Sequence, residues 1–125
     1  MKVSMVVEDE PDMRDLIKMT LMEDPRFEIV VEAASAEDAI GLADTHEPGL
    51  VVLDHSLDGE LTGLDAAPKI KAVAPECKII LFTADASLRS RADAEPSVDA
   101  FLVKTDLLKL LSLAQRFMGL GPIPT

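Results

Sequence analysis

The chain has 125 residues, of which 48% are hydrophobic, and it carries a formal net charge of -11 at pH 7. This length fits one domain with a real core, and four Phe with no Trp or Tyr leave little aromatic surface for stacking nucleobases. The negative field repels phosphate backbones and anionic lipid, so we expect no direct nucleic-acid binding and no membrane contact.

The chain also has few features of a secreted or membrane protein. A single cysteine, Cys77, excludes an intramolecular disulfide. No run approaches the roughly 18 to 20 apolar residues of a membrane span. We therefore expect a cytoplasmic protein.

Five short apolar runs alternate with segments of helical periodicity. The apolar runs predict strands at residues 3–7, 28–31, 50–54, 78–83 and 100–103. The periodic segments predict helices at residues 11–23, 36–45, 64–73, 88–94 and 106–118. Strict alternation with short connections is typical of an α/β fold, in which helices cover both faces of a mostly parallel sheet.

Local chemistry supports several of these boundaries. Pro11 suits the first turn of a helix, and Ser35, followed three residues later by an acid, is typical of an N-cap. Pro68 either kinks the third helix or marks its start. Residues 119–125 cannot continue the last helix, so we divide the chain into a domain at residues 1–118 and a tail or linker start at residues 119–125.

Acidic side chains follow two of the predicted strands. Glu8 and Asp9 come after the first strand, and Asp54 ends the third. Open α/β folds keep ligand sites at the carboxyl edge of the sheet, so we expect these carboxylates to meet. Two like charges about 4 Å apart repel by roughly 4 kcal/mol at an effective dielectric near 20. A divalent cation relieves that repulsion, and oxygen ligands near solvent suit Mg²⁺, with the backbone carbonyl of Ser56 as a further ligand.

The fourth and fifth strands bring two further groups to the same edge. They end in Thr83 and Lys104, which supply a hydroxyl and an ammonium group. A carboxylate nucleophile, Mg²⁺, a lysine and a hydroxyl together are what phosphoryl transfer needs.

The order of these residues resembles the receiver domain of two-component response regulators, a family of bacterial signalling proteins that includes chemotaxis regulators. The resemblance covers about residues 1–118. It implies a flavodoxin-like (βα)5 three-layer sandwich with a parallel sheet in the order 2-1-3-4-5. It also implies that Asp54 accepts a phosphoryl group from a sensor histidine kinase or phosphotransfer protein, and that Lys104 pairs with this group. The implied Mg²⁺ ligands are Glu8, Asp9, Asp54 and the Ser56 carbonyl.

The resemblance further implies a signalling switch, not an enzyme acting on a metabolite. Thr83 moves toward a phosphoryl oxygen, and Phe101 is the aromatic residue that turns inward with it. The surface of the fourth helix, fifth strand and fifth helix then binds a downstream protein or a missing output domain. The apolar arc at residues 107–118 is wider than one core needs. This segment is therefore either deeply buried or forms a surface for a partner or a homodimer.

The loop after Asp54 departs from the common receiver pattern. Asp58 stands where a proline is usual, and the glycine of the next turn arrives one residue late, at Gly63. Thr105 replaces a proline that often follows the lysine. We therefore expect a reshaped loop.

Three alternatives stay open beside the receiver. A pseudo-receiver would keep the fold and bind partners without taking phosphate. A haloacid-dehalogenase-type aspartyl-phosphate phosphatase places its nucleophile after the first strand, with a second Asp two residues later, an arrangement that neither Glu8 nor Asp54 has. A flavodoxin-like flavin carrier needs hydroxyls and glycine after the first strand, where residues 8–10 are all acidic.

Overall fold

The computed structural model describes residues 3–27 and 30–123. Its strands are β1 (Ser4–Val7), β2 (Val30–Ala33), β3 (Leu50–Leu53), β4 (Lys78–Thr83) and β5 (Ala100–Val103). Its helices are α1 (Pro11–Met22), α2 (Ala36–His46), α3 (Gly63–Val73), α4 (Arg89–Ala94) and α5 (Leu110–Phe117), with two 3-10 helices, η1 (Ala86–Leu88) and η2 (Lys104–Lys109).

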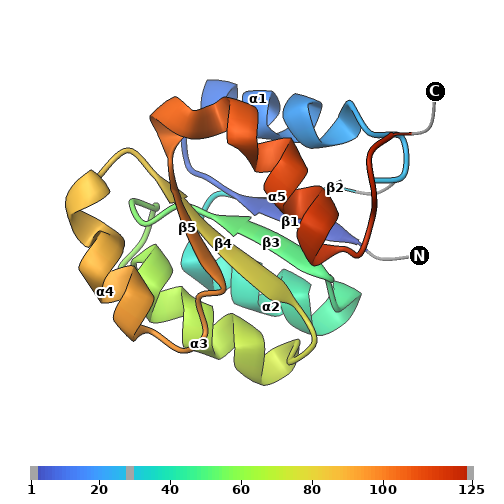
Figure 1. Ribbon diagram of the computed structural model, residues 1–125. Coiled ribbons are helices and arrows are strands. Elements are labelled where there is room, and N and C mark those ends of the chain that lie inside the picture. Colours follow the sequence, from blue (N-terminus) through green and yellow to red (C-terminus); the bar gives the residue numbers. More distant parts are fainter. Residues whose placement is uncertain (1–2, 28–29, 124–125) are drawn as a thin grey trace.

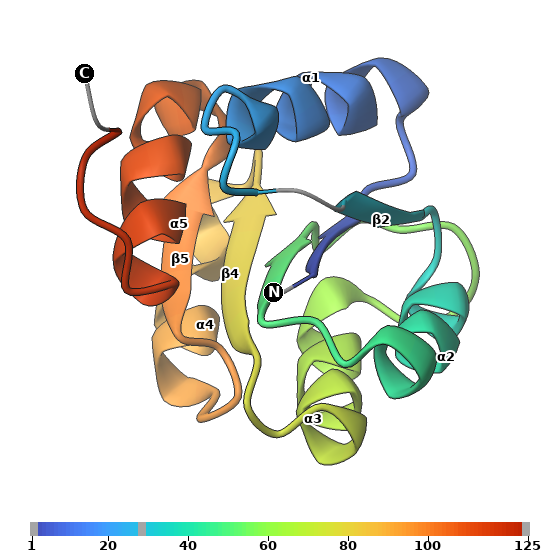
Figure 2. The same ribbon diagram turned by 90° about the vertical axis from the view of Figure 1, so that its right-hand side faces the viewer.

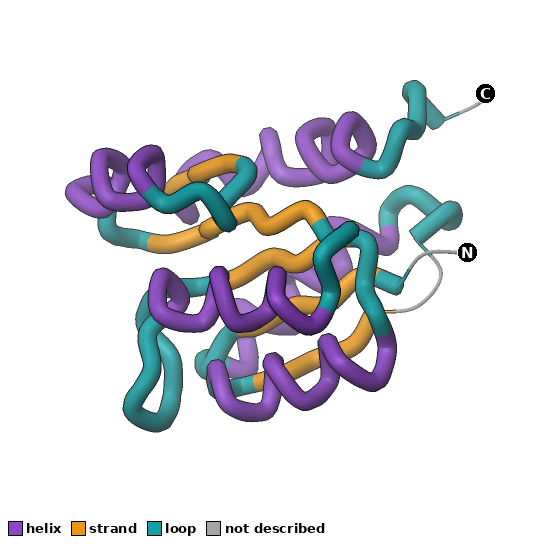
Figure 3. Tube along the Cα trace, turned by 90° about the horizontal axis from the view of Figure 1, so that it is seen from below, coloured by secondary structure: helices purple, strands orange, loops and turns teal. Residues whose placement is uncertain are grey.

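The strands form one parallel sheet in the order β2-β1-β3-β4-β5, which confirms the predicted topology. Helices α1 and α5 cover one face, and α2, α3 and α4 cover the other (Figure 1). Figure 3 views the molecule from below, with helices in front of the strands that they cover. The predicted three-layer sandwich is therefore confirmed.

Apolar side chains fill both spaces between the sheet and the helices. Every residue of β1 and β3 is buried, as continuous apolar strands in a doubly covered sheet require. On the α2 and α3 side the helices contribute alanines, including Ala39, Ala43 and Ala66, which are 0% exposed. On the opposite side Phe82 packs in a cluster with residues of α1 and α5. The core is aliphatic with few aromatic rings, as the composition predicts.

The register of the strands aligns their carboxyl ends. Val7 of β1 lies opposite both Ala33 of β2 and Leu53 of β3. Thr83 of β4 lies opposite Val103 of β5. The residues that follow β1, β3 and β5 therefore emerge at one edge, beside the end of β4 (Figure 2).

Helix starts follow the local chemistry where a cap is present. Pro11 is the first residue of α1, and the Ser35 side chain caps α2 by accepting a hydrogen bond from the Asp38 amide at 3.1 Å, so both predictions are confirmed. Thr62 and Asp65 form a capping box at the start of α3. Pro68 therefore lies inside α3, and the suggestion that it marks the start of this helix was wrong.

The predicted helix at residues 106–118 was wrong in its first turn. Residues 104–109 form η2, in which Asp106 has φ -98° and ψ 30°, and α5 begins only at Leu110. The conformation of Asp106 lies outside the α-helical region, so it separates the 3-10 turn from α5.

Other boundaries shift by smaller amounts. The predicted helix at residues 88–94 starts as η1, and α4 itself has six residues. Strand β2 covers Val30–Ala33, because these residues pair with Ser4–Val7, whereas the prediction was 28–31. Residues 28 and 29 of that prediction lie outside the described residues.

The chain after α5 folds back on the domain. Gly119, with φ +70°, ends the helix, and Leu120 packs against the core cluster beside α5. Nη2 of Arg26 donates a hydrogen bond to the Gly121 carbonyl at 2.6 Å. The division of the chain near residue 118 stays a prediction. Within the described residues, no helix combines the length and the hydrophobicity needed to cross a bilayer.

Candidate functional site

Two buried carboxylates lie at the carboxyl edge of the sheet. Glu8 is 0% exposed and Asp54 is 4% exposed. The strand ladder continues into both residues, because the Glu8 amide donates to Ala33 and the Asp54 amide donates to Val7, each at 2.9 Å. Their backbone positions are therefore determined by the sheet, which rigidly places their side chains at this edge.

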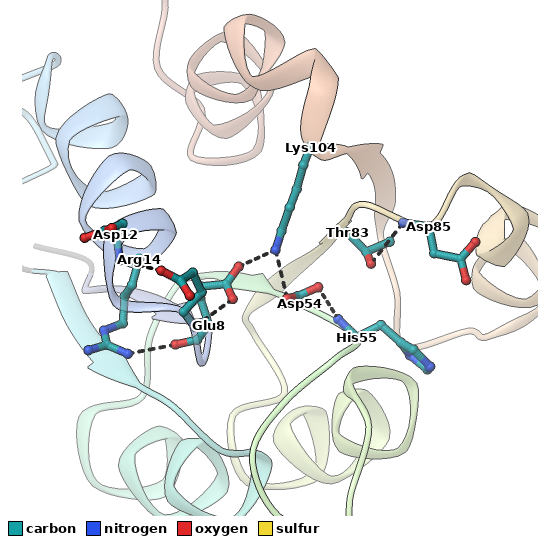
Figure 4. Close-up of polar contacts among 9 residues, drawn as sticks. Glu8, Asp12, Arg14, Asp54, His55, Thr83, Asp85 and Lys104 are labelled. Atoms are coloured by element: carbon teal, nitrogen blue, oxygen red, sulfur yellow. Dashed lines mark hydrogen bonds and ion pairs between the residues drawn. The ribbon is translucent and has the colours of Figure 1, made fainter.

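Lys104 joins the two carboxylates. Its Nζ lies 2.6 Å from Oε1 of Glu8 and 3.0 Å from Oδ2 of Asp54 (Figure 4). The backbone amide of His55 donates to the other Asp54 oxygen, Oδ1, at 2.7 Å. Each carboxylate oxygen of Asp54 therefore accepts one hydrogen bond, Oδ1 from the His55 amide and Oδ2 from Lys104.

The site holds more negative charge than Lys104 neutralises. Burial raises the pKa of the Glu8 carboxyl to about 7, although Lys104 and the Glu10 amide both favour its ionised form. Burial alone would lower the pKa of Lys104, but its ion pairs with Glu8 and Asp54 outweigh that effect and raise it. The ammonium group therefore stays charged at neutral pH, whereas Glu8 lies near its titration point.

A third carboxylate completes a group that could hold a cation. Ligand oxygens of Glu8, Asp9 and Asp54 all lie within 4.8 Å of one another. Asp9 is half-buried and follows Glu8 directly. A set of carboxylate oxygens with a net negative charge fits a hard divalent cation such as Mg²⁺. Ser56 lies in the exposed loop after Asp54, and the part of its carbonyl in this site stays a prediction.

Thr83 lies at the same edge, and Phe101 does not. Thr83 is 2% exposed at the end of β4, and its hydroxyl accepts a hydrogen bond from the Asp85 amide at 3.4 Å. Figure 4 shows Asp54 between Glu8 on one side and Thr83 on the other. Phe101 is half-buried on β5, and the guanidinium carbon of Arg89 lies 4.8 Å from its ring centroid. This cation–π contact places Phe101 against the first residue of α4.

Gly63 supports the backbone of Asp54, a role that the sequence prediction missed. Its amide donates to the His55 carbonyl at 2.9 Å. A Cβ at this position would lie 2.1 Å from the Asp54 carbonyl oxygen. The only signal in the sequence was the displaced glycine itself, which gave no indication that two backbones meet there.

The loop after Asp54 reaches the start of α2. Asp58 forms an isolated parallel β-bridge with Ser35, and the Asp58 amide donates a hydrogen bond to the Ala34 carbonyl at 3.4 Å. The Leu61 amide lies 3.4 Å from Oε1 of Glu37. Gly59 turns the loop with φ +91°, a conformation that favours glycine. The expectation that this loop departs from the common receiver course stays a prediction.

Arg14 is a second residue that the sequence prediction missed. Its Nη1 donates to the backbone carbonyl of Glu8 at 2.9 Å. Figure 4 shows its side chain beside the acidic group. No spacing in the sequence indicates a contact between a helix side chain and a strand-end carbonyl.

Comparisons with known proteins identify the family of the chain. The sequence model of the response regulator receiver domain matches residues 5–114. Nitrate/nitrite response regulator protein NarP of Escherichia coli is 33% identical over 101 residues, which are 80% of this chain and 46% of that protein. Chemotaxis protein CheY of Listeria monocytogenes is 35% identical over 80 residues, which are 64% of this chain and 66% of that protein.

A solved structure has the same fold. Response regulator protein TrrA of Thermotoga maritima, in complex with Mg²⁺-BeF, has a TM-score of 0.81 at 30% sequence identity, and the match covers 94% of this chain and 99% of that one. Several curated relatives are longer than this chain, which spans 20% of protein-glutamate methylesterase/protein-glutamine glutaminase 2 of Paramagnetospirillum magneticum.

Proposed function

The chain belongs to the response regulator receiver domain family, and on this premise we propose that it is a phosphoacceptor switch of a two-component system. Asp54 accepts a phosphoryl group from a sensor histidine kinase or a phosphotransfer protein. The observation that carries the proposal is the single ammonium group of Lys104, which bridges two buried carboxylates at the carboxyl edge of the sheet.

The contacts of Asp54 support its role as the nucleophile. A carboxylate oxygen attacks phosphorus and forms an acyl phosphate, while the bond between phosphorus and the donor imidazole nitrogen breaks and its electron pair stays on the imidazole. The His55 amide holds Oδ1, whereas Oδ2 is held by Lys104. A flexible ammonium group can move with the incoming phosphoryl oxygens, so Oδ2 is the oxygen that we assign to the attack.

Groups around Asp54 would stabilise the transferred phosphoryl group. Lys104 turns from the Asp54 carboxylate to a phosphoryl oxygen, and the Thr83 hydroxyl donates to another. The carboxylates of Glu8, Asp9 and Asp54, with the Ser56 carbonyl, would hold Mg²⁺, whose charge offsets the negative charge of the carboxylates and the phosphoryl oxygens. The chemistry of the protein is then limited to gaining this group and to its hydrolysis, without an activity on a metabolite.

The proposed output surface consists of α4, β5 and α5. Movement of Thr83 would draw Phe101 inward and change the face next to it. Leu108 is 97% exposed in η2, whereas Leu110 is 0% exposed, so the apolar arc of this segment is buried only in part. We propose that this surface binds a downstream protein, an output domain beyond this sequence or a second copy of the chain. We also propose that the protein acts in the cytoplasm.

Phosphorylation of Asp54 can be tested by intact mass spectrometry. Wild type and Asp54→Asn are incubated with a small acyl-phosphate donor, with and without Mg²⁺. We expect one added phosphoryl group in wild type with Mg²⁺ and none in Asp54→Asn. An adduct that persists in Asp54→Asn would refute the site. A wild type that neither gains phosphate nor binds a phosphate analogue would favour a pseudo-receiver that acts only by binding partners.

The output surface needs a separate measurement. Size-exclusion chromatography with and without a beryllium-fluoride mimic separates a dimer induced by phosphorylation from a monomer that docks to another protein. An elution volume unchanged by the mimic would count against self-association through the α5 face.

A further inference from the structure

We propose that Arg14 is a positioning residue for the carboxylates that hold the cation. Its guanidinium group fixes the peptide between Glu8 and Asp9, and thereby holds Asp9 opposite Asp54. This inference rests on the proposed function only in taking Mg²⁺ as the cation.

The backbone of Glu8 at the end of β1 is hydrogen-bonded on both sides. The Glu8 amide makes the last ladder bond to β2, with the Ala33 carbonyl as acceptor at 2.9 Å. The carbonyl of the same residue accepts instead from Nη1 of Arg14 at 2.9 Å. A buried carbonyl needs a donor, and here that donor is a side chain of α1. Arg14 therefore continues the restraint of the strand beyond its last ladder bond.

The guanidinium group of Arg14 is itself held in place by Glu32. Nε of Arg14 lies 3.3 Å from Oε1 of Glu32 on β2, and Nζ of Lys18 lies 3.1 Å from Oε2 of the same carboxylate. The Arg14 side chain is 23% exposed. Its backbone amide bonds to the Glu10 carbonyl in the first turn of α1. Arg14 thus links the Glu8–Asp9 peptide to β2 through Glu32 and to α1. Figure 4 shows the bond from Arg14 to the Glu8 carbonyl.

The direction of the Asp9 carboxylate depends on the peptide that Arg14 holds. The Cα of Asp9 is the next atom along the chain after the peptide that Arg14 restrains, so the direction of its carboxylate depends on the plane of that peptide. Glu8 and Asp54 have ladder bonds on their own amides, whereas Asp9 lies beyond the ladder. Without Arg14, the Asp9 oxygen would lose its fixed place within 4.8 Å of the other two ligands.

Positioning and simple electrostatics predict opposite results when Arg14 is removed. The guanidinium group is a cation near three carboxylates, so its Coulomb effect opposes the binding of Mg²⁺. If charge were its only contribution, Arg14→Ala would bind Mg²⁺ more tightly. If Arg14 positions Asp9, the same variant binds Mg²⁺ more weakly. The sign of the change therefore separates the two explanations.

Lys18→Ala is the matched control. Lys18 is also on α1 and also bonds to Glu32, but it makes no bond to Glu8. Its removal takes away one positive charge and leaves the Glu8 carbonyl bonded. We expect the dissociation constant of Mg²⁺ to change less than about twofold in this variant.

The experiment is calorimetric titration of the unphosphorylated full chain with Mg²⁺. We expect Arg14→Ala to raise the dissociation constant by about 10-fold, the lower end of what loss of a group that orients a metal ligand costs. Arg14→Lys should recover part of the affinity, because its ammonium group can donate to the Glu8 carbonyl but lacks the separate Nε and Nη1 donors with which Arg14 contacts Glu32 and Glu8. Among variants that fold, a general loss of stability would not produce this order of Mg²⁺ dissociation constants, in which Arg14→Lys lies between wild type and Arg14→Ala.

A dissociation constant in Arg14→Ala that equals or falls below that of wild type would overturn the inference. If Arg14→Ala does not fold, an unchanged constant in Arg14→Lys overturns it equally. A wild type that gains phosphate at Asp54 while the Arg14 variants bind Mg²⁺ normally would contradict only the role of Arg14. A wild type that binds no Mg²⁺ would contradict both this role and the metal site of the proposed function.

Discussion

Gly63→Ala should disturb the phosphoacceptor through its backbone. The φ of Gly63 is not positive, so the site needs glycine for space and not for conformation. A Cβ would lie 2.1 Å from the carbonyl oxygen of Asp54, 2.8 Å from its carbonyl carbon and 2.9 Å from Cα of His55. All three atoms are backbone, so no side chain can rotate away to make room.

The size of the effect follows from this overlap. The two backbones must separate by roughly 1 Å, and overpacking of this kind costs about 1–3 kcal/mol. We expect the free energy of unfolding to fall by about 2–3 kcal/mol, with a lower urea midpoint and an unchanged m-value. Because Asp54 moves relative to Lys104, the rate of phosphoryl transfer from a small donor should fall by about 100-fold, the cost of a misplacement near 1 Å.

Gly41→Ala provides the control for this substitution. Gly41 lies inside α2, and a Cβ there meets nothing within 4 Å. This variant should gain about 0.5–1 kcal/mol of stability from helix propensity, with an unchanged rate of phosphoryl transfer. The reasoning is refuted if Gly63→Ala unfolds at the wild-type urea midpoint and takes phosphate at the wild-type rate.

Three further variants test the charges of the fold. Lys104→Met leaves Glu8 and Asp54 buried without their cation, so urea unfolding at pH 8 should show a loss of about 3 kcal/mol, and equal stability would contradict the pairing. Glu8 has a pKa raised from 4.5 to about 7. The folded state therefore binds the proton of the Glu8 carboxyl more tightly than the unfolded state does. Without Mg²⁺, the free energy of unfolding of wild type should fall by roughly 3 kcal/mol as pH rises from 4.5 to about 7. Glu8→Gln should lack that slope, and a slope equal to that of wild type would show that another group causes it. Hydrogen bonds from Arg26 lower the pKa of the Asp24 carboxyl below its ordinary 3.8. The ionised Asp24 therefore stabilises the folded state above pH 3.8, and this stabilisation is lost as pH falls through the lowered pKa. Asp24→Asn should remove this part of the acid transition in a pH titration of stability, and an unaltered transition would exclude Asp24 as its source.

The fold could be predicted because its signals are local. Continuous apolar runs and helical periodicity alternate along the chain, and this alternation with short connections allows few topologies. The polar residues at the strand ends were found by the same argument, since parallel strands that end in register deliver their next residues to one edge. Glu8, Asp54 and Lys104 are therefore in contact as the strand order requires.

The remaining features depend on contacts between distant segments. Gly63 approaches Asp54 because the loop between them turns back, and Arg14 reaches Glu8 because α1 crosses the edge near β2. The first turn of the last helical segment is 3-10, with Asp106 outside the α-helical region of φ and ψ, although its apolar periodicity continues through that turn. Arg89 covers Phe101 through a contact that no sequence pattern indicates.

The most direct test of the central claim is to identify the residue that carries the phosphoryl group. Borohydride reduces an acyl phosphate to an alcohol, so a phosphorylated aspartate becomes homoserine, which peptide mapping by mass spectrometry locates. After incubation with Mg²⁺ and a small acyl-phosphate donor, we predict homoserine at position 54 and unmodified Glu8 and Asp9. Reduction at Glu8 or Asp9, or no reduced residue in protein that has gained phosphate, would contradict the assignment of Asp54 as the acceptor.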